Sequence, residues 1–134
     1  MYSRRRFIQI SGMLGATFLL SGCDLFKGTA PASSSSQPVQ EVQVALKEWQ
    51  IIPANISVKA GKVRFIVQNA GTMSHGLEVE SQMPSVPFGE EIQPFPAGQT
   101  RTLEVELAPG QYQYYCQVSG HKDLGMKGNL LVQP

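Results

Sequence analysis

Apolar and polar residues alternate in short runs along the chain from residue 42 onward. The run 100–107 is the clearest, because Leu103, Val105 and Leu107 are separated by polar residues. A period of two places successive side chains on opposite faces of an extended strand. The pattern therefore predicts short strands over residues 42–47, 55–59, 62–69, 76–80, 100–107, 111–116 and 128–132.

Two segments interrupt this alternation. Residues 49–53 are expected to form a turn. Residues 81–99 contain several prolines, which lack a backbone donor and exclude a regular central strand. We predict a long surface excursion there, with one short turn of helix near Glu90. Its apolar residues Met83, Phe88 and Phe95 either form a docking patch or cover the core, and we favour the core.

The composition favours an all-β fold. The 134 residues include 13 glycines and 9 prolines, and no sustained helical period follows the N-terminal segment. Short strands separated by turns predict a two-sheet antiparallel β-sandwich. Residues 41–134, about 94 residues, are enough for one such domain, which we expect to be a monomer.

The N-terminus reads as an export signal. Three arginines, Arg4 to Arg6, precede a short apolar run over residues 10–20, which predicts a signal peptide over residues 1–22. The run is too short and too rich in glycine for a membrane span of about 20 residues. The arginines with Phe7 resemble a twin-arginine export motif.

A lipid anchor is predicted at Cys23. The sequence Leu20-Ser21-Gly22-Cys23 resembles the bacterial lipobox, which implies cleavage before Cys23 and acylation of its sulfur. The alternative, a buried core cysteine, has nothing core-like around it. Residues 23–40 are rich in Ser and Pro and predict a flexible tether of roughly 20–25 Å. We therefore expect an exported protein, lipid-anchored to a membrane on its periplasmic or other extracytoplasmic face.

The charge excludes one class of partner. The formal net charge is +1, from 11 basic and 10 acidic residues, and removal of the three signal arginines leaves 8 against 10, or −2. The predicted domain has no basic stripe and no interleaving of aromatic and basic residues. Nucleic acid is therefore not expected as a partner.

The chemistry of the chain is concentrated near its C-terminal end. Cys116, His121 and Met126 are separated by four residues each, and His75, the other histidine of the chain, follows a predicted strand. Taken singly, the cysteine would be core, the histidine solvated and the methionine a core filler. Together, one thiolate, two imidazoles and a weak thioether form the blue-copper ligand set, although Met73 is an alternative to Met126.

The same donors indicate which metal binds and what it does there. Structural zinc sites seldom use methionine, and hard cations prefer oxygen ligands. Soft sulfur with two imidazoles selects copper. Because the protein ligands fill the site and leave no open position for a substrate, we expect electron transfer and no enzyme activity.

Residues 61–132 resemble a cupredoxin of the plastocyanin or azurin type. The resemblance rests on the segment 61–65, Asn69 before His75, the segment 109–112 and the Cys-x4-His-x4-Met loop. It implies a Greek-key β-sandwich and one type 1 copper. It also implies His75, Cys116 and His121 as equatorial ligands, Met126 as axial ligand, and an exposed edge of His121 as the port for electrons.

One position departs from the family pattern. Gly76 stands where many cupredoxins have an asparagine that braces the ligand loop. The expected function is a blue copper protein that shuttles single electrons between membrane or periplasmic redox partners, through Cu(I) and Cu(II). A copper carrier that delivers copper to an oxidase is the alternative. A multicopper oxidase is not expected, because Tyr115 and Gln117 flank Cys116 where a trinuclear cluster needs histidines.

Overall fold

The computed structural model describes residues 37–134. The predicted signal peptide, Cys23 and most of the predicted tether lie outside the described residues. Nine strands form within residues 37–134: β1 (Gln40–Lys47), β2 (Gln50–Ile52), β3 (Asn55–Lys59), β4 (Gly61–Asn69), β5 (His75–Ser81), β6 (Gly89–Phe95), β7 (Thr100–Leu107), β8 (Gly110–Tyr115) and β9 (Lys127–Gln133). No helix in this part of the chain is long and apolar enough to cross a membrane.

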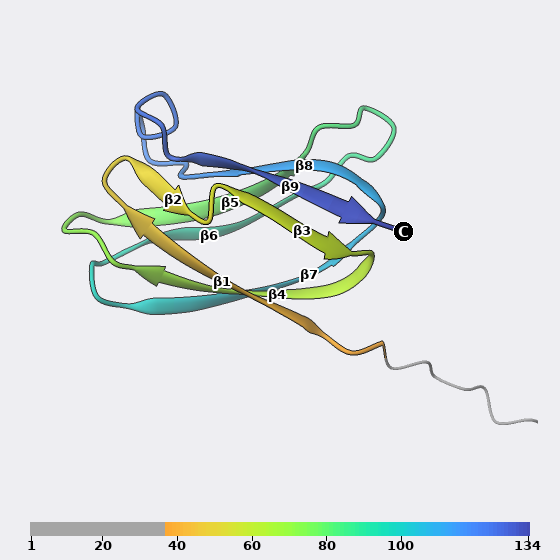
Figure 1. Cartoon of the computed structure of the whole chain (residues 1–134). Helices are drawn as coiled ribbons and strands as arrows, with labels where there is room; N and C mark the ends of the chain where they lie inside the picture. Colours follow the sequence, from red (N-terminus) through yellow and green to blue (C-terminus); the bar gives the residue numbers. More distant parts are fainter. Residues whose placement is uncertain (1–36) are drawn as a thin grey trace, which may run out of the picture. The chain divides into compact units, whose positions relative to one another are not determined.

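The strands form two sheets that face each other (Figure 1). One sheet has the order β2-β1-β4-β7 and the other the order β3-β9-β8-β5-β6. The all-β sandwich predicted from the sequence is confirmed. Both sheets are mixed, however, because β1 pairs with β4 and β3 pairs with β9 in parallel. The alternation of residues predicts strands but does not tell whether neighbouring strands are parallel or antiparallel. Strand β3 belongs to one sheet, and the next strand, β4, pairs with β1 in the other sheet.

The core lies between the two sheets. In β4, the side chains of Val63, Phe65 and Val67 are fully buried and alternate with more exposed residues. In the facing sheet, Leu77 and Val79 of β5 are fully buried. Each such side chain contributes roughly 1.5–3 kcal/mol when it leaves water, so this core supplies the rigidity on which the loops are mounted.

Two details of the chain differ from the prediction. Residues 50–52 form strand β2, which pairs with β1 as a hairpin, where a turn was expected. The predicted helical turn near Glu90 is wrong, because that residue lies in strand β6. Strand β6 is at the edge of its sheet, where Pro94 is tolerated because one side of an edge strand needs no ladder hydrogen bonds.

The apolar residues of the proline-rich segment cover the core, as favoured from the sequence. Phe95 is buried, and Met83 and Phe88 are partly buried against the core. The ring of Phe88 meets that of Tyr112 edge-on, with centroids 5.7 Å apart. These residues therefore serve packing.

Three connections meet at the end of the sandwich opposite the C-terminus (Figure 1). They are the β1–β2 turn, the β4–β5 loop and the β8–β9 loop. The last of these contains the Cys-x4-His-x4-Met sequence, and the β4–β5 loop leads into His75. The fold thus places all the predicted ligands at one end of the molecule.

Candidate metal centre

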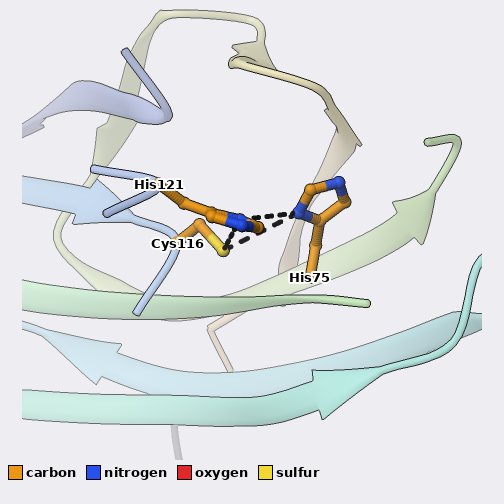
Figure 2. A group of neighbouring side chains, drawn as sticks. All are labelled: His75, Cys116 and His121. Carbon is orange, nitrogen blue, oxygen red and sulfur yellow. Dashed lines mark hydrogen bonds between the residues drawn. The ribbon is translucent and has the colours of Figure 1, made fainter. Parts of the chain in front are cut away.

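Three buried side chains converge at this end of the sandwich (Figure 2). His75 begins β5, Cys116 follows β8, and His121 lies in the β8–β9 loop. Cys116 Sγ lies 3.5 Å from His121 Nδ1 and 3.9 Å from His75 Nδ1, and the two Nδ1 atoms are 3.2 Å apart. Donors about 2.0–2.3 Å from a central metal ion have separations of this size.

Backbone hydrogen bonds shape the loop between Cys116 and Met126. The amide of Cys116 donates to the carbonyl of Met126, and the amide of Met126 donates to the carbonyl of His121, both at 3.0 Å. Gly120 has φ +80° and Gly125 has φ +118°, in the left-handed region that favours glycine. The two glycines thus allow the loop to fold back on itself, as the sequence predicts.

The two candidate methionines lie in different surroundings. Met126 is fully buried, and its backbone is hydrogen-bonded to the backbone of Cys116 and of His121. Met73 is 42% exposed. The burial of Met126 and its backbone hydrogen bonds to Cys116 and His121 favour it over Met73 as the thioether ligand. Its role as a ligand stays a prediction, as do those of His75, Cys116 and His121.

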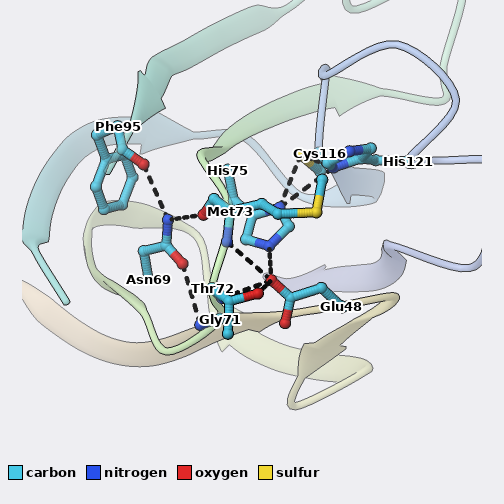
Figure 3. A network of polar contacts seen from close by, with 9 residues as sticks. All are labelled: Glu48, Asn69, Gly71, Thr72, Met73, His75, Phe95, Cys116 and His121. Atoms are coloured by element: carbon cyan, nitrogen blue, oxygen red, sulfur yellow. Dashed lines mark hydrogen bonds and ion pairs between the residues drawn. The ribbon is translucent and has the colours of Figure 1, made fainter. Parts of the chain in front are cut away.

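A carboxylate that the sequence analysis missed contacts His75 (Figure 3). Glu48, in the β1–β2 turn, places Oε1 3.2 Å from Nε2 of His75. The same oxygen accepts hydrogen bonds from the amides of Thr72 at 2.6 Å and Met73 at 3.0 Å. These contacts, the amide of Thr72 first, lower the pKa of Glu48 to about 2. No spacing rule identifies Glu48, because it lies 27 residues before His75 in the sequence.

The expected exposed edge of His121 is wrong. Only 5% of His121 is exposed, and the ring of Trp49 meets it edge-on with centroids 5.1 Å apart. Trp49 is itself 40% exposed, so it separates His121 from solvent. Burial, with a further contribution from His75, lowers the pKa of His121. The β1–β2 turn therefore covers both imidazoles, with Glu48 on His75 and Trp49 on His121.

Residues 13–132 match the family described as the cupredoxin-like domain. The chain belongs to this family. Among curated proteins, it is 30% identical over 114 residues to the iron uptake system component EfeO of Escherichia coli K12. The match covers 85% of this chain and 28% of EfeO, so the chain spans about a quarter of that relative's length.

Solved structures with the same fold include two auracyanins. The dithionite-reduced auracyanin of Roseiflexus castenholzii has a TM-score of 0.63 and 18% identity, over 71% of this chain and 98% of that chain. Auracyanin A, a "blue" copper protein of Chloroflexus aurantiacus, has a TM-score of 0.58 and 19% identity, over 72% and 100%. The blue copper oxidase of Nitrosomonas europaea has a TM-score of 0.59 and 18% identity, over 72% and 39%. At these identities the likeness concerns the fold.

The donors of this cupredoxin fit one type 1 copper ion. Two imidazole nitrogens and one thiol sulfur lie within 4.8 Å of one another in a buried site. This combination of soft sulfur with imidazole is the set that copper prefers. Hard cations are disfavoured because none of the three donors is an oxygen.

The side chain of Gln117 lies next to Gly76. Gly76 is the position at which many cupredoxins have the bracing asparagine. Nε2 of Gln117 donates to the carbonyl of Ile92 at 2.8 Å, which ties the residue after Cys116 to β6. A Cβ at Gly76 would lie 2.6 Å from Oε1 of Gln117 and 2.7 Å from the carbonyl oxygen of Ile92. A side-chain hydrogen bond thus connects the residue after Cys116 to β6, and Gln117 donates it.

Proposed function

We propose that this cupredoxin is an electron carrier that passes single electrons between redox partners of the membrane or the periplasm, through one type 1 copper. The observation that carries the proposal is the buried group of His75, Cys116 and His121, whose donor atoms already lie 3.2–3.9 Å apart. The likeness of the fold to auracyanins, one of which is described as a blue copper protein, supports the same function.

Each residue has a distinct role in this proposal. His75 and His121 would hold copper through their Nδ1 atoms, which face Cys116, and Cys116 would bind it as the thiolate. Met126 would supply a weak thioether ligand. Copper, when bound, supplies the one-electron couple between Cu(I) and Cu(II). Because backbone hydrogen bonds and burial hold the ligand loop in place, we expect the protein to rearrange little between the two oxidation states.

We propose that the domain has no enzyme activity of its own. Tyr115 and Gln117 flank Cys116, so the histidines that connect a type 1 site to a trinuclear cluster are missing. The three donors are at most 5% exposed, which leaves little access for a substrate. The blue copper oxidase shares the fold, but this chain spans 39% of its length.

The similarity to EfeO favours a second candidate, service in an iron uptake system. Non-haem iron sites commonly use two histidines and a carboxylate. Here Glu48 contacts Nε2 of His75, whereas the Nδ1 atom faces the site, so the carboxylate is not among the converging donors. In such a system the domain would act on electrons and would not bind iron itself. If the protein retained Fe(II) in preference to copper, iron binding would replace electron transfer as the favoured function.

The predicted export signal and lipid-anchored Cys23 would hold the domain at the outer face of a membrane. A tether of roughly 20–25 Å would let it turn between a donor and an acceptor. Both partners are expected to be redox proteins. A copper carrier would use the same ligands and differs only in releasing the metal.

Voltammetry of the copper-loaded chain, with a Cu(I) chelator in the solution, separates the carrier of electrons from the carrier of copper. An electron carrier gives a reversible one-electron wave that persists through many cycles. The matched control is Cys116→Ser, which removes the thiolate and should abolish the wave. A wild-type wave that decays as the chelator takes up Cu(I) would contradict electron transfer and favour copper delivery.

A further inference from the structure

The carboxylate of Glu48 is hydrogen-bonded to His75, through the ring nitrogen Nε2 that faces away from Cys116 and His121. Its Oε1 atom accepts from four groups: Nε2 of His75, the amides of Thr72 and Met73, and the hydroxyl of Thr72. The side chain of His75 is fully buried and that of Glu48 is 26% exposed. The contact is therefore shielded from water on the histidine side.

This contact determines which nitrogen of His75 carries the proton. A carboxylate only accepts hydrogen bonds, so Nε2 must be the donor to Glu48. In the neutral imidazole, Nδ1 is then unprotonated and presents its lone pair to the site. Nδ1 is also the atom that lies near Cys116 and His121. The nitrogen that faces the other donors is thus the one left without a proton.

We propose that Glu48 is a positioning residue of the copper site, which fixes the ring and tautomer of His75 and favours Cu(II) over Cu(I) by its negative charge. This inference rests on the proposed function. A hydrogen-bonded carboxylate raises the basicity of a histidine ligand, and the higher charge of Cu(II) gains more from a nearby anion.

Nothing else in the described part of the chain offsets this charge by an ion pair. Within residues 37–134, the carboxylate of Glu48 pairs with His75 and with no lysine or arginine. The Thr72 and Met73 amides stabilise the anion, and they also attach the β4–β5 loop to the β1–β2 turn. Glu48 therefore connects the loop that precedes His75 to the strand pair that covers the site.

The substitution Glu48→Gln tests the charge and keeps the size. The amide oxygen can still accept the proton of Nε2, but the negative charge is lost. We expect the Cu(II)/Cu(I) ratio at a fixed ambient potential to fall about tenfold, which corresponds to a rise of about 59 mV in the reduction potential. The matched control is Glu106→Gln, on β7, because Glu106 lies opposite Lys62 in the β4–β7 ladder, at the end of β4 remote from the site. Its potential should equal that of the wild type.

A second measurement, on the wild-type protein without metal, does not depend on how the variant folds. Nitrogen NMR at a pH about two units above the ordinary histidine pKa of about 6.5 should show the proton of His75 on Nε2. A proton on Nδ1 would overturn the proposed role in positioning. Equal potentials in Glu48→Gln, Glu106→Gln and wild type would overturn the role in favouring Cu(II).

These outcomes are distinct from failure of the proposed function itself. If the wild-type protein binds Cu(II) but shows no intense thiolate-to-copper absorption, the electron-transfer proposal fails before Glu48 is tested. If that absorption is present and Glu48→Gln leaves the potential unchanged, only the role of Glu48 fails.

Discussion

Replacing Gly76 by alanine should destabilise the domain, because the added methyl group has no room. Gly76 is buried where the pairing of β5 with β6 shifts register between His75 and Leu77. The new Cβ would lie 2.7 Å from the carbonyl oxygen of Ile92 and 2.6 Å from Oε1 of Gln117. The Gln117 side chain can rotate away, but the Ile92 oxygen is part of the β6 backbone, so the strand itself must move.

The expected magnitude follows from these two contacts. Overpacking of a filled site costs about 1–3 kcal/mol. For a domain of this size, 1 kcal/mol corresponds to about 4–8 °C in Tm, so we expect Gly76→Ala to lower Tm by roughly 5–20 °C. Displacement of Gln117 would also break its hydrogen bond to Ile92, which adds about 0.5–1.5 kcal/mol.

Thermal unfolding of the metal-free chains, followed by calorimetry, measures this effect. The matched control is Gly89→Ala, also in the β5–β6 pair, because a Cβ at Gly89 has no neighbour within 4 Å. That control should stay within about 0.5 kcal/mol of the wild type. Adding Gln117→Ala to Gly76→Ala should recover only part of the loss, since the Ile92 oxygen remains. Equal Tm values for the two alanine variants would refute the reasoning.

Two further predictions concern single aromatic residues. Burial raises the pKa of Tyr114 to about 12. Stability from its protonated hydroxyl, which donates to the carbonyl of Pro53, is therefore present below about pH 10 and is lost as the pH rises through 12. In Tyr114→Phe, the free energy of unfolding measured with urea should change less with pH over that range than in the wild type. The same pH dependence in both proteins would contradict the role given to the Tyr114 hydroxyl. Trp49, the one tryptophan of the chain, contacts the ring of His121, so its fluorescence should fall when Cu(II) binds there. Zn(II), which has no redox chemistry, should quench Trp49 little when it binds. Equal quenching by Cu(II) and Zn(II) would contradict this prediction.

The sequence predicts the parts of this fold that depend on local pattern. Strands β3 and β7 have the predicted bounds. Asn55–Lys59 alternates throughout, Thr100–Leu107 alternates from Leu103 onward, and turn residues follow both strands. The convergence of Cys116 and His121 was also predictable, since both lie on one glycine-containing loop. The structure confirms that His75 joins them.

What the sequence does not predict depends on contacts between distant segments. Strand β6 was missed because the prolines of residues 81–99 argue against a strand. Pro94 lies within β6 itself and is acceptable only because β6 is at the edge of its sheet. Glu48 and Trp49 were missed because the β1–β2 turn reaches the two histidines through space. The same turn buries His121, whose edge was expected to be exposed. Gln117 could be linked to Gly76 only once the distance between them was known.

Visible absorption and EPR of the Cu(II)-loaded chain test the central claim most directly. A thiolate bound to copper together with two imidazoles predicts an intense thiolate-to-copper band and a narrow copper hyperfine splitting. Cys116→Ser should lose the band, whereas Ser119→Ala, in the same loop but outside the donor group, should keep it. Binding of Cu(II) by the wild-type protein without that band would contradict a type 1 copper site.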